Sequence, residues 1–204
     1  MGAQPEPIDE WDGGFGWIQD EFMRRASHAL VVAGSVWLID PVDDPGYEER
    51  VRALGVPAGV LQLLDRHERG CAAWAARLGV PHLRAWQTLG GAPFEALPVR
   101  DGRWWKEVAL WEPVSRTLVC ADALGTVRYF CAPGERIGLH PLVRPFPPRA
   151  LGRVAPQRIL CGHGAGVSDA ADASLQEAIR TARRRLPALL LGSIMRRRSS
   201  AGRA

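Results

Sequence analysis

The apolar run Thr117–Leu124, TLVCADAL, constrains the fold of this chain most strongly, because it places one carboxylate at the end of a predicted buried strand. Asp122 closes the β-type part of the run and precedes small residues. Open α/β sheets bind ligands outside the carboxyl ends of their strands, where Asp122 would lie. An Asp at this point also suits a helix N-cap, so two interpretations stay open: a cap, and a metal-binding or catalytic group.

Other short runs predict an α/β domain around this segment. Strands are expected in a hairpin within His28–Ile39, at Val60–Leu64, Glu107–Trp111 and Thr117–Ala121, and in the segment RILCGHGAGV. Helices are expected over CAAWAARLG, which ends at Gly79, and over DAADASLQEAIRTARRRL, which is long enough for about five turns.

The length of 204 residues predicts one domain. No apolar run approaches the roughly 18–20 residues that span a bilayer, and the first residues, MGAQPEPIDEWDGG, lack the basic and apolar regions of a secretory signal. We therefore expect a cytoplasmic protein without a membrane span. The four cysteines form no C-x-x-C pair and are expected to be reduced and mostly buried.

Charge divides the chain into a body and a tail. Eight arginines and no acidic residues follow Ile179; without them the net charge of +4 would be −4. Such a tail favours a solvated end over a surface for nucleic acid or acidic lipid. The expected organisation is an irregular N-terminal lead-in at 1–27, a domain at 28–191 and a basic, disordered tail at 192–204.

Two further strand ends carry polar groups of the metal-binding type. The segment Asp65–His67 follows an apolar run, and His163 lies between two glycines directly after another. Each histidine taken alone also fits a structural turn residue. Together with Asp122 they form a set of imidazole and carboxylate groups that suits zinc, iron or manganese.

The order of these elements resembles the metallo-β-lactamase family, whose members hydrolyse esters, thioesters, lactams or phosphodiesters with one or two metal ions. The resemblance runs from about His28 to Leu186. It is carried by VWLIDP at 36–41, by VLQLLDRHERGCAAWAARLGVP at 60–81, by CADAL at 120–124, and by Gly162-His163-Gly164 before a long helix. It implies a four-layer αβ/βα sandwich in a single domain.

The family's His-x-His-x-Asp-His loop is altered here. Its alignment on Gly79 places His67 on the last histidine and Arg66 on the aspartate, while Gln62 and Leu64 replace the first two histidines. The family's Pro-Gly-His segment resembles DGRWWKEVAL at 101–110, with Arg103 in place of the histidine. An amide, an alkyl group and a cation cannot form a normal zinc site, so the resemblance implies an empty first site.

The second site would keep His67, Asp122 and His163 as candidate ligands for at most one zinc, iron or manganese ion, with Asp65 as a substitute carboxylate if the loop slipped. Arg66 and Arg103 place positive charge beside it, which opposes a cation and favours salt bridges to Asp122. A metal-free cluster of arginine, aspartate and histidine that binds an anion is therefore also consistent with the sequence.

The resulting hypothesis is a divergent hydrolase of this family with a degenerate metal site, in which an ion-activated water attacks an ester-type bond of a small-molecule substrate, and Asp122, Arg66 and Arg103 act in catalysis. The alternative is a non-catalytic member that binds a small anion or a protein partner. Trp104, Trp105 and Trp111 would line a pocket or pack in the core.

Overall fold

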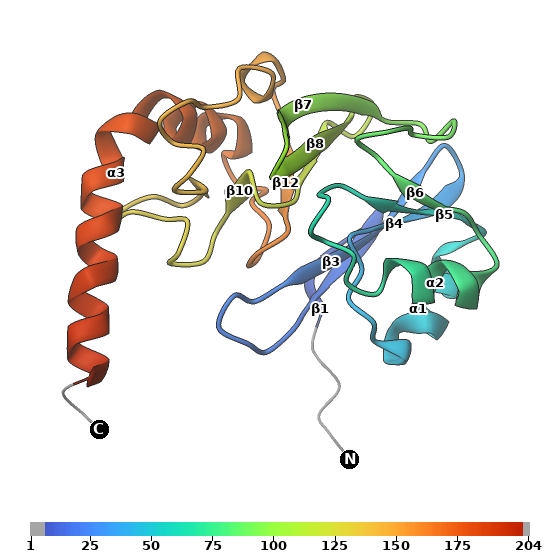
Figure 1. The fold of residues 1–204 in the computed structure, drawn as a ribbon. Helices are drawn as coiled ribbons and strands as arrows, with labels where there is room; N and C mark the ends of the chain where they lie inside the picture. The colour runs from blue at the N-terminus through green and yellow to red at the C-terminus, as the bar shows by residue number, and fades with distance from the viewer. Residues whose placement is uncertain (1–6, 202–204) are drawn as a thin grey trace.

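The computed structural model describes residues 7–201, whose strands form two larger sheets and a short pair (Figure 1). The first sheet has the order β1-β2-β3-β4-β5-β6: β1 (Pro7–Trp11), β2 (Gly14–Ile18), β3 (Ala26–Val32), β4 (Ser35–Ile39), β5 (Pro57–Gln62) and β6 (His82–Arg84). The second has the order β12-β9-β8-β7: β7 (Glu95–Gly102), β8 (Trp105–Glu112), β9 (Thr117–Cys120) and β12 (Arg158–Cys161). The pair is β10 (Leu124–Gly125) with β11 (Gly138–Leu139).

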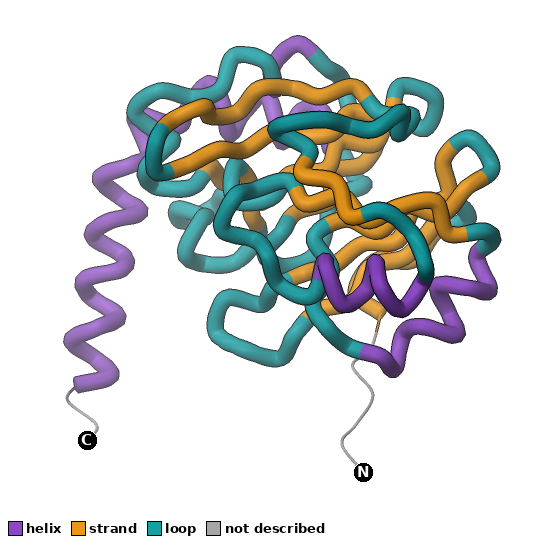
Figure 2. Tube along the Cα trace, turned by 45° about the vertical axis from the view of Figure 1, so that its right-hand side comes forward, coloured by secondary structure: helices purple, strands orange, loops and turns teal. Residues whose placement is uncertain are grey.

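Two α-helices and the first part of a third cover the outer faces of the sheets, and the rest of the third helix extends beyond them (Figure 2). They are α1 (Glu48–Leu54), α2 (Cys71–Leu78) and α3 (Ala171–Ala201); two short 3₁₀ turns are η1 (Pro45–Tyr47) and η2 (Leu151–Arg153). The helices α1 and α2 pack on the first sheet and α3 packs on the second, so the layers run helix, sheet, sheet, helix.

Alternation along the strands builds this arrangement. In β4, Val36 and Leu38 pack toward α1 and α2, whereas Trp37 and Ile39 pack between the sheets. The same period of two in β9 sends Leu118 toward α3 and Val119 to the inner core. Both faces of these strands are therefore apolar, as the short uninterrupted runs of the sequence predict. The expected α/β sandwich in one domain is confirmed.

The structure differs from the sequence expectations at both ends. The lead-in at 1–27, expected to be irregular, contains β1 and β2, because Gly13 and Gly14 permit a tight connection and the alternating Phe15 and Trp17 fill the core under α1 and α2. At the other end, α3 runs for 31 residues and continues past Leu191, the last residue of the expected domain, into the segment expected to be a disordered tail. Residues 202–204 of that tail lie outside the described residues.

Strand β7 is a further difference, since none of the expected strands covers Glu95–Gly102. It carries Pro98 at an irregularity in its pairing with β8 and forms the edge of the second sheet, which is where a proline is tolerated. The cysteines are free, and all but the half-buried Cys131 are buried. Among the described residues, no helix is both long and apolar enough to cross a membrane.

Two isolated antiparallel bridges join the sheets at one end of the sandwich. One pairs Arg25, just before β3, with His163, just after β12. The other pairs Leu64, just after β5, with Glu107 in β8. Both bridges bring strand ends of different sheets together, and the candidate site lies at this junction.

Candidate functional site

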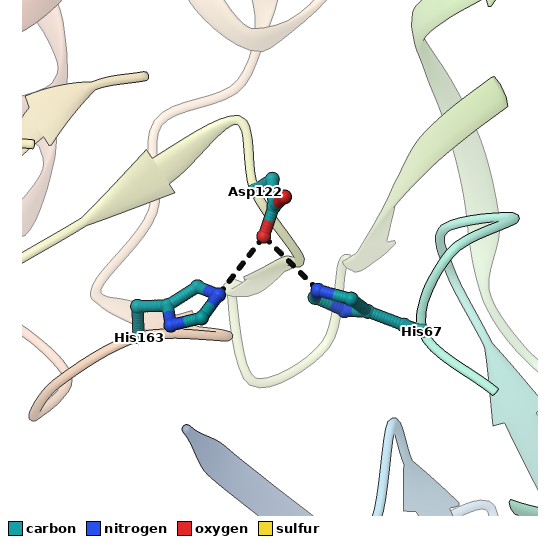
Figure 3. A group of neighbouring side chains, drawn as sticks. All are labelled: His67, Asp122 and His163. Carbon is teal, nitrogen blue, oxygen red and sulfur yellow. Dashed lines mark hydrogen bonds and ion pairs between the residues drawn. The ribbon is translucent and has the colours of Figure 1, made fainter. Parts of the chain in front are cut away.

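Three side chains from separate strand ends meet at the junction of the sheets: His67, Asp122 and His163 (Figure 3). His67 follows β5, Asp122 follows β9 and His163 follows β12. The parallel pairing of β9 with β12 aligns Cys120 with Cys161, so the residues that follow these strands emerge side by side. The interpretation of Asp122 as a helix N-cap is wrong, because Asp122 is followed by β10.

Glycines on both sides of His163 allow the backbone to approach neighbouring residues closely. A Cβ atom on Gly162 would lie 2.7 Å from the carbonyl oxygen of Ala121, and one on Gly164 would lie 2.2 Å from Oγ1 of Thr126. Gly164 also has φ of +89°, a conformation that favours glycine. The close approach of the two strand ends brings the imidazole of His163 to Asp122.

Both histidines contact the same carboxylate oxygen. Nε2 of His67 and Nε2 of His163 each lie 3.0 Å from Oδ1 of Asp122. The candidate ligand atoms all lie within 4.8 Å of one another. His67 and His163 are buried and Asp122 is half-buried, so the three groups are shielded from water.

The outward nitrogen of each ring is held by a second acceptor. Nδ1 of His67 lies 3.0 Å from Oδ2 of Asp40, whose Oδ1 accepts from the backbone N–H of Leu63 at 2.8 Å. Nδ1 of His163 lies 2.8 Å from the carbonyl oxygen of Met23. Since carbonyl and carboxylate oxygens accept hydrogen bonds, each Nδ1 carries the hydrogen.

Each Nε2 atom faces Oδ1 of Asp122, which is an acceptor. In a neutral ring that nitrogen would carry a lone pair, and in a protonated ring it would carry a second N–H. A lone pair 3.0 Å from the Asp122 oxygen would repel it, so each contact needs a positive charge between nitrogen and oxygen. Protonation of both rings meets this need, and so does one metal ion among the three atoms. Ligands around tetrahedral zinc lie about 3.3–3.5 Å apart for bonds of about 2.0–2.1 Å, so a small expansion of the cluster would accommodate an ion.

The charges in this cluster shift the pKa values of two of its members. Burial alone would raise the pKa of Asp122, but its hydrogen bonds with His163 and His67 hold that pKa well below its usual range. For His67, burial and the charge of Arg69 favour the neutral ring, whereas the hydrogen bonds to Asp122 and Asp40 favour the charged one, and the balance raises the pKa. The cluster thus stabilises a carboxylate facing positive charge.

Arg69 is a cation that the sequence analysis did not anticipate at this site. Its Nη1 donates to the carbonyl oxygens of Ala26 and Asp40 at 2.7 and 3.0 Å, and its Nη2 donates to that of Gly162 at 3.2 Å. Nη2 also lies 3.3 Å from Nε2 of His67. The guanidinium thus joins the start of β3 to the ends of β4 and β12. It also competes with any ion for the lone pair on Nε2 of His67.

The two arginines expected at the site lie in different places. Nη2 of Arg66 is 3.9 Å from Oδ2 of Asp122, so Arg66 borders the triad as expected. Arg103 lies on the exposed turn between β7 and β8, where its guanidinium stacks over Trp104 at 4.9 Å instead of pairing with Asp122. Of the tryptophans considered for a pocket or the core, Trp105 and Trp111 are buried and Trp104 is exposed.

The positions of the expected empty first site have structural uses. The side-chain amide of Gln62 donates to the carbonyl oxygen of Leu64 at 2.8 Å, and its oxygen lies 3.0 Å from Nε2 of His82. The side chain of Leu64 is fully buried in the core between the sheets. Asp65 lies outside the triad.

The buried carboxyl group of Glu107 comes from the residue that bridges to Leu64. Oε1 of Glu107 accepts from the backbone N–H of Ala123 at 2.8 Å, and Oε2 accepts from the indole N–H of Trp105 at 2.7 Å. Burial and the charge of Asp122 raise the pKa of Glu107 to about 8, despite these hydrogen bonds. Glu107 therefore fixes the loop next to Asp122 from inside the protein.

Asp40, Arg69 and Glu107 are the site residues that sequence reasoning missed. Asp40 carried a signal, because it closes the apolar run VWLI and precedes a proline, as VWLIDP shows. Glu107 had a weaker one, as the only acidic residue inside the predicted strand Glu107–Trp111. Arg69 sits in a charged loop where nothing in the spacing separates it from its neighbours.

Comparison with known proteins adds information on the fold. No family model and no curated protein matches the sequence. Solved structures do match. The DIM-1 metallo-β-lactamase exposed to ceftazidime superimposes with a TM-score of 0.57 at 14% identity over 88% of this chain and 98% of that one.

Two further solved structures have the same architecture. The metallo-β-lactamase TMB-1 gives a TM-score of 0.53 at 10% identity over 90% of this chain and 97% of the other. TTHA1623 in a di-iron-bound form gives 0.50 at 18% identity over 84% and 97%. These identities are low, and the similarity extends over most of each chain. The sandwich with its triad at the junction of the sheets is therefore a metallo-β-lactamase fold.

Proposed function

We propose that this chain is a hydrolase that holds one divalent metal ion between His67, Asp122 and His163 and cleaves an ester-type bond. The observation that carries the proposal is the arrangement of the imidazoles, which direct both Nε2 atoms at one carboxylate oxygen and donate both Nδ1 hydrogens outward. Metal-binding histidines are oriented by such outer acceptors. Metallo-β-lactamases and a di-iron protein that share the fold support a metal at this position.

The donor set defines which ions fit. Two imidazoles and one carboxylate suit zinc, iron or manganese and leave coordination positions open for water and substrate. A divalent ion held by these three residues would supply Lewis-acid activation of water and of the ester at neutral pH. Hydrolysis then adds the elements of water across a carbonyl or phosphoryl ester and releases an acid and an alcohol.

The residues of the chain supply orientation and shielding. Asp40 fixes the ring of His67, and the carbonyl group of Met23 fixes the ring of His163. Glu107 holds the backbone of Ala123 and with it the loop that presents Asp122. Because the histidines are buried, the ligands are preorganised before any ion arrives.

The metal content per chain tests the proposal. The protein is expressed with zinc, iron and manganese available, purified without a chelator or a histidine tag, and analysed by elemental mass spectrometry. We expect about one ion per chain, and loss of that ion in Asp122→Ala and in His163→Ala. His82→Ala is the matched control, because His82 is a partly exposed histidine bound to Gln62 and not to the triad.

A second candidate function is the binding of a small anion or a protein partner without catalysis. The guanidinium of Arg69 favours it, since this half-buried cation already contacts the nitrogen of His67 that an ion would use. Wild-type protein without metal under all these conditions, together with Asp122→Ala and His163→Ala variants that lose only stability, would overturn the hydrolase proposal in favour of this one.

A further inference from the structure

One half-exposed arginine stands at the edge of the triad. Arg66 directly precedes His67 in the chain, and its side chain is 51% exposed. It approaches the oxygen of Asp122 that the histidines leave free, with Nη2 3.9 Å from Oδ2. Arg66 makes no hydrogen bond within the part of the chain that the structure describes, so its N–H groups remain available to a ligand.

A rigid platform holds this guanidinium. Cζ of Arg66 lies 4.7 Å from the centre of the Trp105 ring. The ring is itself buried, donates its indole N–H to Glu107 at 2.7 Å, and meets the edge of His140 at 4.9 Å between ring centres. A cation–π contact with a ring fixed in this way restricts the plane of the guanidinium.

Aromatic rings continue from this platform to the triad. We call Trp105, His140, Tyr129 and Phe130 the aromatic cluster. Phe130 stacks on His163 at 5.5 Å, and the hydroxyl group of Tyr129 lies 3.4 Å from Nε2 of His140. Burial lowers the pKa of His140 to about 4, so the cluster is uncharged near neutral pH. Arg66 therefore places an exposed positive charge against an uncharged cluster.

We propose that Arg66 binds a phosphate or carboxylate group of the substrate, so that the site prefers esters that carry an acidic group close to the bond that is cleaved. The hydrolytic part of this inference rests on the proposed function, whereas the binding of the anion does not need turnover. A guanidinium presents forked N–H donors that match either anion, and a side chain already held in place loses less freedom when it binds.

Calorimetric titration with inorganic phosphate and with acetate tests the binding, using protein loaded with zinc and protein treated with a chelator. In both forms we expect Arg66→Ala to weaken binding at least about tenfold, because a charge-assisted hydrogen bond is lost. Arg66→Lys keeps the charge without the planar fork and should fall between wild type and Arg66→Ala. The anion that binds more tightly identifies phosphate or carboxylate as the recognised group.

Arg158→Ala is the matched control for this titration. Arg158 also stacks on a tryptophan, with Cζ 4.5 Å from the Trp11 ring, but it lies at the opposite end of β12 from His163. Removal of this charge should leave anion binding unchanged. The inference is overturned if Arg66→Ala binds both anions within about twofold of wild type, or if wild type binds neither at millimolar concentration.

Hydrolysis of two related esters separates this inference from the proposed function. For para-nitrophenyl hemisuccinate, which has a free carboxylate, Arg66→Ala should raise KM by about tenfold more than it does for the neutral para-nitrophenyl acetate. Equal effects on both esters would contradict the anion preference while leaving a hydrolase. If the zinc-loaded wild type cleaves neither ester but still binds the anions through Arg66, the failure belongs to the hydrolytic function on such esters.

Discussion

His67, Asp122 and His163 point into a common space from three strand ends, whereas Gln62 and Leu64, a few residues before His67, turn back into the protein. The first group leaves nitrogen lone pairs or N–H groups facing a carboxylate. The second group satisfies its polar atoms internally or has none. The segment from Gln62 to His67 thus carries two residues that face the interior and one, His67, that faces the triad.

The two groups are therefore expected to contribute to different properties of the protein. Gln62 and Leu64, the inward-turned group, should contribute to the free energy of unfolding and little to ion binding. Residues of the triad are expected to contribute to ion binding and less to stability. Each prediction below assigns one residue to one of these contributions, to both or to neither.

The largest effect is expected for the pH dependence of stability in metal-free protein. The pKa of Glu107 is raised by burial to about 8, whereas the unfolded chain would have its ordinary value of 4.5. Folding therefore retains a proton that the unfolded state loses, and the stability supplied by neutral Glu107 falls as pH rises from about 4.5 to about 8. Urea unfolding should show a loss of about 4–5 kcal/mol over this window.

Glu107→Gln is the control for that loss. The amide cannot ionise, so this part of the pH dependence should disappear. The amide nitrogen also replaces one acceptor oxygen, so either the Ala123 N–H or the Trp105 indole N–H loses its partner, at a cost of about 1–3 kcal/mol at every pH. An identical pH profile in wild type and variant would show that Glu107 ionises normally, and the separation of roles would fail at this residue.

Asp40→Ala should have the next largest effect and should change both contributions. It removes the acceptor of the Leu63 N–H and of the His67 ring and leaves the half-buried Arg69 without its neighbouring carboxylate. We expect unfolding to require about 3–5 kcal/mol less and metal affinity to fall about 10–100-fold. Asp40→Asn retains an acceptor oxygen and should lose less of each. Unchanged metal affinity in folded Asp40→Ala would mean that the carboxylate does not orient His67.

Leu64→Ala tests the inward-turned group alone. Its side chain is fully buried between the sheets, so truncation should cost about 3 kcal/mol in urea unfolding. The metal content of the folded variant should equal that of wild type, because Leu64 offers no ligand atom. A variant with normal stability and no metal would reverse the assignment.

Arg103→Ala should have the smallest effect. Its side chain is exposed and stacks on Trp104, so stability should change by less than about 0.5 kcal/mol, and metal content and anion binding should stay at wild-type values. Anion affinity reduced as strongly as in Arg66→Ala would place Arg103 at the site, as the sequence resemblance implies.

Much of the fold could be predicted from the sequence, because the strands that support the site are short apolar runs closed by Asp40, Asp122 or Gly162. The first two strands could not be recognised, because β2 has glycine at alternate positions and β1 contains a proline and two adjacent acidic residues. Their place in the first sheet depends on pairing with β3 and on the packing of Phe15 and Trp17 beneath α1 and α2.

The site could be predicted in part. His67, Asp122 and His163 each follow an apolar strand, and this signal suffices to nominate them. The roles of Arg69 and Glu107 depend on contacts across the junction of the two sheets, with the carbonyl oxygen of Gly162 and the N–H of Ala123. The spacing of residues in the sequence does not indicate such contacts between distant segments. For the same reason Arg103, placed by analogy with a motif, lies on a turn away from the triad.

The close contact of Gly162 with Ala121 limits which substitutions the site can accept. A single added methyl group at position 162 would collide with main-chain atoms, which cannot move aside as a flexible side chain can. Variation that alters the ligand preference of the site must therefore arise in the loops that carry Arg66, Tyr129 and His140. In a mutational library these loop positions should accept many residue types, whereas position 162 should accept only glycine.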